Sequence, residues 1–129
     1  MDKLQIYLDS VRSAPFEWGV HDCALFAARG ADAAFGTRFT ASVLRFNCHS
    51  AKDYRRMQRE GASLEAMTTA EVGEPLPEGA VLLRGDVVLI SSAGRKCLGL
   101  AVPPVVVAPS KVGFIPMPVD SVTQAWRIG

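Results

Sequence analysis

The sequence lacks the features that would place it at once in a functional class. It has no hydrophobic run near the roughly 20 residues that span a bilayer, and no paired CxxC motif. An excess of one charge is missing too, since 14 Lys and Arg residues stand against 13 Asp and Glu residues. A net charge of +1 therefore gives no reason to expect a nucleic-acid partner or a membrane-binding domain.

Cysteine is scarce. Three cysteines do not suit a disulfide framework, which uses an even number, so they indicate reduced thiols in a protein made in a cytosol. The opening residues MDKLQIYLDSVRS carry two aspartates among their apolar positions, and this pattern does not fit a secretory signal.

What is present is ordinary globular composition. The chain has 129 residues, of which 49% are hydrophobic and 21% charged, and this predicts a single domain over residues 1–129. Residues 1–73 have helical patterns and residues 80–129 have strand patterns, with the Pro/Gly-rich link GEPLPEGA between them. Helices followed by strands predict an α+β fold, with N-terminal helices packed on a C-terminal antiparallel sheet of about five strands.

The predicted helices have recognisable starts and stops. Apolar spacing predicts a helix over 2–13, and Asp22 and Gly36 are the expected cap and stop of a second helix. Small residues on one face of that helix, among them Gly30, would allow close packing on a sheet. Two more helices are predicted over 51–61 and 63–73, and residues 37–50 are interpreted as a loop with a short extended piece.

The strand half consists of short β-branched segments separated by Gly, Pro or Ser. The predicted strands lie within 81–90, 96–102, 103–108, 112–118 and 122–128. The uncharged stretch PPVVVAP needs burial, either inside the domain or as an edge strand that pairs with another chain. Asp86, which follows Gly85, is expected to cap a turn before its strand.

Three motifs carry a resemblance to a known family. The stretches FEWGVHDCALF (16–26) and RGDVVLI (84–90), with the Gly-containing strand that follows, resemble the NlpC-type branch of the papain-like cell-wall peptidases. From Pro15 to Gly129 the chain is also similar to a group of small phage tail proteins with the same Trp-Gly-x-His-Asp-Cys opening and Ala-Trp-Arg-Ile ending. The resemblance implies a papain-like fold, a nucleophile position at Cys23, and other tail proteins of the virion as partners.

The position of Cys23 has a physical rationale. A thiol at the first turn of a helix lies beside unpaired backbone N–H groups, which favour the thiolate and can hold an oxyanion. Asp22 is the expected cap of this helix. Trp18 is expected to cover the turn as a structural plug, and in an active relative it would border the substrate groove.

The base that such a nucleophile needs is missing from its expected place. In the peptidases a histidine opens the strand after the Gly-Asp motif, but residues 96–98 are Lys, Cys and Leu here. Only His21 and His49 exist in the chain. His21 lies two residues before Cys23 on the same turn, and His49 lies in the unpredictable segment FNCHS, so both are weak candidates for the base.

The sequence also bears on a metal site and on a charged binding surface. The three cysteines and two histidines have no CxxC or HxxxH spacing, so no metal site is expected, and no motif calls for a cofactor. Basic side chains cluster on the predicted helix 51–61, at Lys52, Arg55, Arg56 and Arg59. Such a cluster is usually a solvated helix face, although it would also suit an acidic partner.

Two functions follow from these observations. The first is a structural or assembly subunit of a bacteriophage tail, near the tip or hub, on a peptidase-like fold without the usual catalytic histidine. The alternative is an active cysteine peptidase or amidase that contacts peptidoglycan and cleaves its peptides during infection. In that case Cys23 attacks, and His21, His49 or a histidine of a partner chain serves as base.

Overall fold

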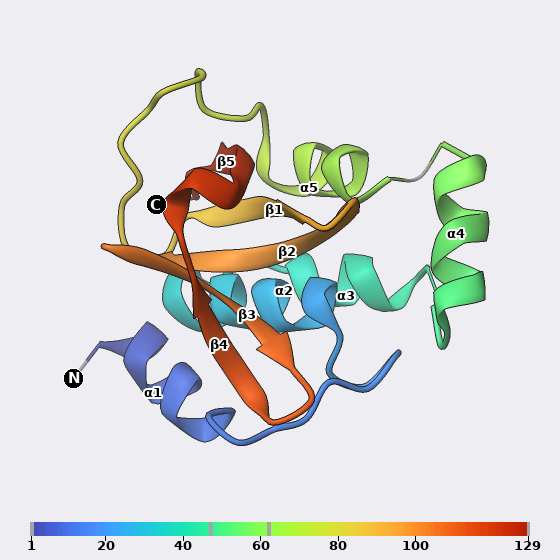
Figure 1. Cartoon of the computed structure of the whole chain (residues 1–129), viewed down its shortest axis with the longest axis horizontal. Coiled ribbons are helices and arrows are strands. Elements are labelled where there is room, and N and C mark those ends of the chain that lie inside the picture. The colour runs from blue at the N-terminus through green and yellow to red at the C-terminus, as the bar shows by residue number, and fades with distance from the viewer. Residues whose placement is uncertain (1, 47, 62, 129) are drawn as a thin grey trace.

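The protein is an α+β fold with a five-stranded antiparallel sheet. A computed structural model describes residues 2–46, 48–61 and 63–128, and Figure 1 shows their arrangement. The helices of the described residues come first, and they are α1 (Lys3–Ser10), α2 (Cys23–Phe35), α3 (Phe39–Leu44), α4 (Ala51–Arg59) and α5 (Leu64–Val72). The strands follow as β1 (Val87–Ser92), β2 (Arg95–Val102), β3 (Val105–Ser110), β4 (Gly113–Met117) and β5 (Val122–Trp126), with a 3₁₀ turn η1 (Val119–Ser121) before β5.

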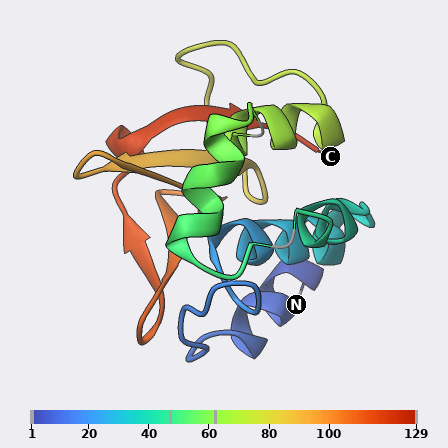
Figure 2. The ribbon, with the colours of Figure 1, turned by 90° about the vertical axis from the view of Figure 1, so that its right-hand side faces the viewer.

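The strand order places β2, which faces the central helix, in the middle of the sheet. Neighbours in the order β4-β3-β2-β1-β5 all pair antiparallel. Turned by 90°, the ribbon shows the sheet on one side and helices α1, α2, α3 and α5 on the other (Figure 2). The helix α4 stands at one end of the molecule, beyond the turn between β1 and β2 (Figure 1).

The helix α2 packs tightly on the sheet, as its small residues predict. Phe26 and Ala27 are fully buried, and a Cβ built on Gly30 would collide with the side chain of Leu100 on β2. The main core lies between these helices and the sheet. A second cluster fills the opposite face of the sheet, where Leu76 and Leu82 of the link before β1 pack against it.

Side-chain caps set the helix starts. Asp2, Asp22, Ser50 and Ser63 each accept a backbone N–H of the first turn of their helix. Gly36 ends α2 with φ of +70°, a left-handed conformation that glycine adopts without strain. The predicted boundaries of α2, α4 and α5 are therefore confirmed to within a residue or two.

Three sequence predictions were wrong in detail. Residues 39–44 form the helix α3 and not a loop with an extended piece, because Phe39 and Val43 supply a buried helical face. The first helix ends at Ser10, earlier than predicted. Within 81–90 only Val87 onward is strand, since the preceding residues form a turn.

For the stretch PPVVVAP the sequence left two alternatives open, and the structure confirms burial inside the domain. It contributes β3, which lies between β2 and β4 and is no edge strand. Val106 and Val107 of β3 are buried within the domain, so the lack of charge is explained by packing in the sheet. Among the described helices, none is both long and apolar enough to cross a bilayer.

Candidate functional site

The Trp18–Gly19 turn and the start of α2 are joined through the carboxylate of Asp22. One oxygen accepts the Leu25 N–H at 2.9 Å and the other accepts the Gly19 N–H at 3.0 Å. Asp22 is buried, and both contacts are structural, which confirms its predicted role as a helix cap. The carboxylate thus fixes where Cys23, the first residue of α2, lies.

The thiol of Cys23 is buried rather than presented to solvent. Cys23 is 8% exposed, and this burial raises the pKa of its thiol far above the usual range, with Cys97 and Asp22 raising it further. The backbone N–H groups of Leu98 and Ala24 act in the opposite direction and are outweighed. Position at a helix start has therefore not produced a reactive thiolate.

The segment 96–98 of β2 does lie beside Cys23, where the resemblance places the base. Cys23 and Cys97 line the same groove, and after burial Cys97 is the largest cause of the raised Cys23 pKa. Burial also raises the pKa of the Cys97 thiol. The strand that would carry an imidazole thus presents a second neutral thiol, which is a poor acceptor for a proton.

His21 is fixed by contacts with Glu17 and Phe26. Its backbone pairs with that of Glu17, and its ring stands edge-on to Phe26 with centroids 5.9 Å apart. Burial lowers the pKa of His21, the nearby Arg29 lowers it further, and Asp22 raises it by less. Its buried Nε2 has no hydrogen-bond partner among the described residues.

His49 packs against the Trp18–Gly19 turn. Its backbone N–H donates to Asp53 at 3.0 Å, and its ring packs on Gly19 so closely that a Cβ there would collide with it. Gly19 has φ of +76°, so both conformation and space require glycine. Among the described residues, the groups that shift the pKa of the Cys23 thiol include neither histidine.

A groove runs past Cys23 between α4 and the β1–β2 turn. It has a volume of about 780 Å³ and is lined by aromatic side chains at Phe16, Trp18 and Tyr54. Trp18 stands edge-on to Phe16 with centroids 4.9 Å apart and is tilted against Tyr54 at 5.9 Å. Trp18 is half-buried between the groove and a small cavity of about 30 Å³ beside Cys23, as expected of a residue that covers the turn.

Asp86 lies outside this groove and has a structural role. Its carboxylate accepts the Leu83 N–H at 2.8 Å, which confirms the predicted turn cap. It also forms a two-pronged ion pair with Arg127, at 2.9 Å to Nη2 and 3.2 Å to Nε. Asp86 is 3% exposed and the Arg127 side chain 32% exposed, so a buried carboxylate pairs with a partly exposed guanidinium.

Three important residues were missed from the sequence. Arg127 had a signal, the Ala-Trp-Arg-Ile motif, but nothing indicated its partner. Tyr54 and Arg95 had none, because they come together with Trp18 only when α4 and the β1–β2 turn are placed in space. Within the described ranges, no group of three or more His, Cys, Asp or Glu side chains is arranged to hold a metal ion.

The thiols should differ in reactivity if Cys23 is unactivated. We expect iodoacetamide near neutral pH to alkylate the half-buried Cys48 at least about tenfold faster than Cys23, because burial limits both access and thiolate. Peptide mass spectrometry over a time course measures the order. The urea-unfolded protein is the control, in which the three thiols react alike. Alkylation of Cys23 before the other two would contradict this and indicate an activated nucleophile.

Comparison with known families places the whole chain in one of them. A family model described as Domain of unknown function (DUF6950) matches residues 1–128. No curated protein matches the chain.

Proposed function

The chain belongs to the DUF6950 family of domains of unknown function, and from the residues of its own site we propose that it is a non-hydrolytic structural subunit of a bacteriophage tail. Its fold is papain-like but has lost catalytic activity, and the protein lies near the tip or hub of the tail. Other tail proteins are its partners, and the assembled virion is its location. The tail-like opening and ending motifs favour this assignment over others that the scaffold serves.

The arrangement of Cys23 supports the papain-like part of the proposal. A cysteine at the first residue of a central helix packs against the middle strand of an antiparallel sheet, and a groove runs past it. The strand after the Gly-Asp strand, β2, lies beside this cysteine through Cys97 and Leu98, and this is the strand that the peptidase resemblance implies.

One observation carries the loss of catalysis. The residue of β2 beside the buried thiol is Cys97, where the resemblance expects a histidine. General-base help is typically worth ~10²- to 10⁴-fold in rate, and a thiol with a raised pKa has little thiolate to replace it. Such a site is unsuited to acyl transfer, and the fold is left with a scaffolding role.

The groove gives the second candidate one supporting feature, because Cys23 is among the residues that line its volume of about 780 Å³. An acyl adduct trapped on Cys23 with a cell-wall peptide would favour a peptidase or amidase. The two candidates differ in what Cys23→Ala does.

The test of the proposal uses phage that carry the chain's gene with Cys23→Ala. We expect the protein in purified virions by mass spectrometry and in tails by immunogold labelling. We also expect unchanged particle assembly and an infectivity within about twofold of wild type, because the thiol only packs a core. A deletion of the gene is the control and should abolish normal tails. Normal Cys23→Ala particles that fail to infect would overturn the proposal in favour of catalysis.

A further inference from the structure

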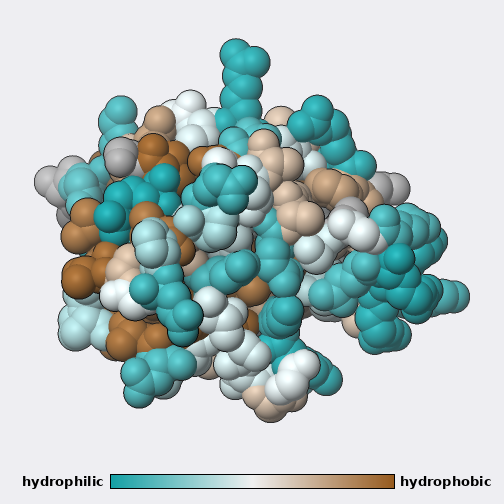
Figure 3. Space-filling model, turned by 90° about the horizontal axis from the view of Figure 1, so that it is seen from above, coloured by the Kyte–Doolittle hydropathy of each residue, from teal (hydrophilic) through white to brown (hydrophobic). Residues whose placement is uncertain are grey.

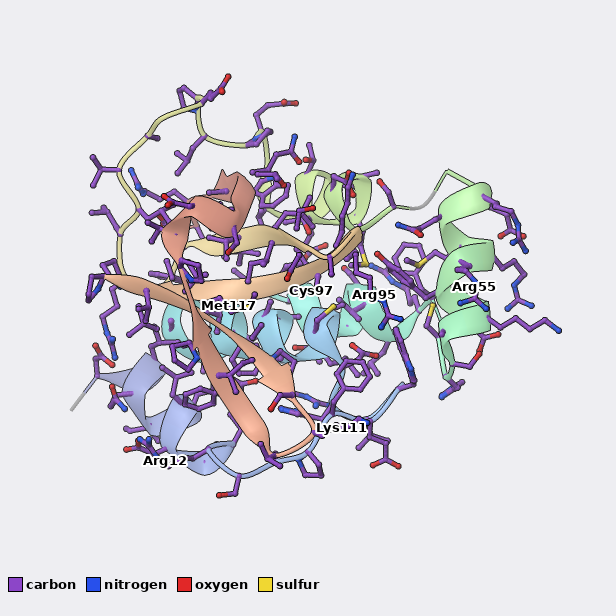
Figure 4. The ribbon with its side chains drawn as sticks, viewed as in Figure 1. Arg12, Arg55, Arg95, Cys97, Lys111 and Met117 are labelled. Carbon is purple, nitrogen blue, oxygen red and sulfur yellow. The ribbon has the colours of Figure 1, made fainter. Side chains whose placement is uncertain are left out.

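The groove beside Cys23 is formed by segments that are far apart in the sequence. Tyr54 and Arg55 come from α4, Arg95 and Cys97 from β2, and Met117 from the end of β4 (Figure 4). Hydrophilic side chains gather over α4, which an indentation sets off from the body when the molecule is seen from above (Figure 3). The proposed structural role assigns no ligand to this groove.

The charge of the groove is positive. Arg55 and Arg95 are exposed, and neither has a carboxylate partner in the described part of the chain. The lining contains one acidic residue, Glu65, and Lys96 pairs with it at 2.9 Å. Two uncompensated guanidinium groups therefore remain, one on α4 and one on β2, and guanidinium groups bind carboxylates by two parallel hydrogen bonds.

The floor of the groove is apolar and aromatic. Trp18 and Tyr54 present tilted rings, Phe16 supports Trp18 from the side, and Met117 adds a flexible thioether. Aromatic rings and methionine are the side chains on which an apolar residue of a partner packs well. The floor thus suits one anchoring side chain, with charged groups to its two sides.

From these features we propose that the groove binds an extended acidic segment of a partner protein. An apolar side chain of the segment packs on Trp18 and Tyr54, and its carboxylates pair with Arg55 on one wall and Arg95 on the other. The inference deepens the proposed function, because under that function the partner is another tail protein. A nucleic acid fits less well, since two free cations are few for a phosphate backbone and the chain's net charge is only +1.

The first experiment is selection of a random octapeptide library on the purified full chain at physiological salt. We expect the selected peptides to be rich in Asp and Glu around one apolar residue. Fluorescence anisotropy of a labelled, selected peptide then gives its dissociation constant. Selection of peptides without acidic enrichment, or tighter binding of cell-wall peptide fragments than of any selected peptide, would overturn the proposal.

Matched charge reversals locate the site. The double variant Arg55→Glu/Arg95→Glu is expected to weaken binding at least about tenfold, since each exposed ion pair is worth a few-fold and reversal adds repulsion. The control Arg12→Glu/Lys111→Glu makes the same change of net charge at exposed residues outside the groove, and it should stay within about twofold (Figure 4). Equal weakening in both variants would mean unspecific attraction and would overturn the proposal.

Trp18→Ala tests the floor separately, and thermal unfolding of each variant verifies that it is folded. We expect Trp18→Ala to weaken peptide binding at least about fivefold while salt dependence stays as in wild type, because the guanidinium groups are untouched.

The two proposals fail in different ways. Virions without the protein would refute the tail assignment and leave the peptide result standing, whereas virions that contain it and a groove that selects no acidic peptide would refute only this inference.

Discussion

Replacing Trp126 by alanine is expected to lower the free energy of unfolding by about 4 kcal/mol, the range for large buried aromatic residues. Trp126 is fully buried at the end of β5, where its backbone pairs with Val87 of β1. Its indole N–H donates to the hydroxyl of Thr69 on α5 at 3.1 Å. Trp126 thus joins the last strand, the first strand and the last helix, and alanine would leave a cavity among them.

Urea unfolding followed by circular dichroism measures the effect. Thr69→Val is the matched control, because it removes the hydrogen bond and keeps most of the volume, and it should lose only about 1 kcal/mol. A loss in Trp126→Ala no greater than in this control would mean that the ring contributes little packing energy. The stability of the core between α5 and the sheet would then come from other residues.

The parts of the fold that were predictable from sequence are those set by local chemistry. Asp22 and Gly36 bound α2 because one is an acceptor for free N–H groups and the other allows a left-handed φ. The strands were located by β-branched runs between turn residues. The helix α3 was missed because Arg38 precedes it without a side-chain cap, and the six residues of α3 are too few to show a period.

The sequence predicted which residue lies at the nucleophile position, but not the burial or the pKa of its thiol. The sequence indicated Cys23 at a helix start and the absence of histidine from 96–98. It gave no measure of burial, which decides the pKa of the thiol, and that burial comes from β2 and Trp18 packing over the turn. The sequence placed Arg55 in a basic cluster on its helix, but it could not place Arg55 in one groove with Arg95, since the two are 40 positions apart.

The two motifs that carried the resemblance in the strand half prove to be in contact with one another. Asp86 belongs to the Arg-Gly-Asp stretch before β1, and Arg127 belongs to the Ala-Trp-Arg-Ile ending, and the two form an ion pair. The pair joins the start of β1 to the end of β5, its neighbour in the sheet. The contact gives Asp86 and Arg127 a structural reason to be where they are.

The ion pair predicts a large loss of stability when its carboxylate is removed. We expect Asp86→Ala to lower the free energy of unfolding by about 2 kcal/mol, because it leaves the Leu83 N–H without its acceptor and leaves the Arg127 guanidinium with only the Val81 carbonyl. Arg127→Met should lose less, since methionine can pack its side chain where the aliphatic part of arginine lies. A double-mutant cycle by urea unfolding gives the coupling between the two residues.

Asp9→Ala is the control for this experiment. Asp9 forms an ion pair with Arg12 at 2.7 Å, similar in length to the Asp86 pair, but both of its side chains are exposed. Its removal should change stability little, because water replaces the partner at an exposed site. Equal effects at Asp9 and Asp86 would show that burial does not strengthen the Asp86 pair. The contact between the two motifs would then be incidental to the stability of the sheet.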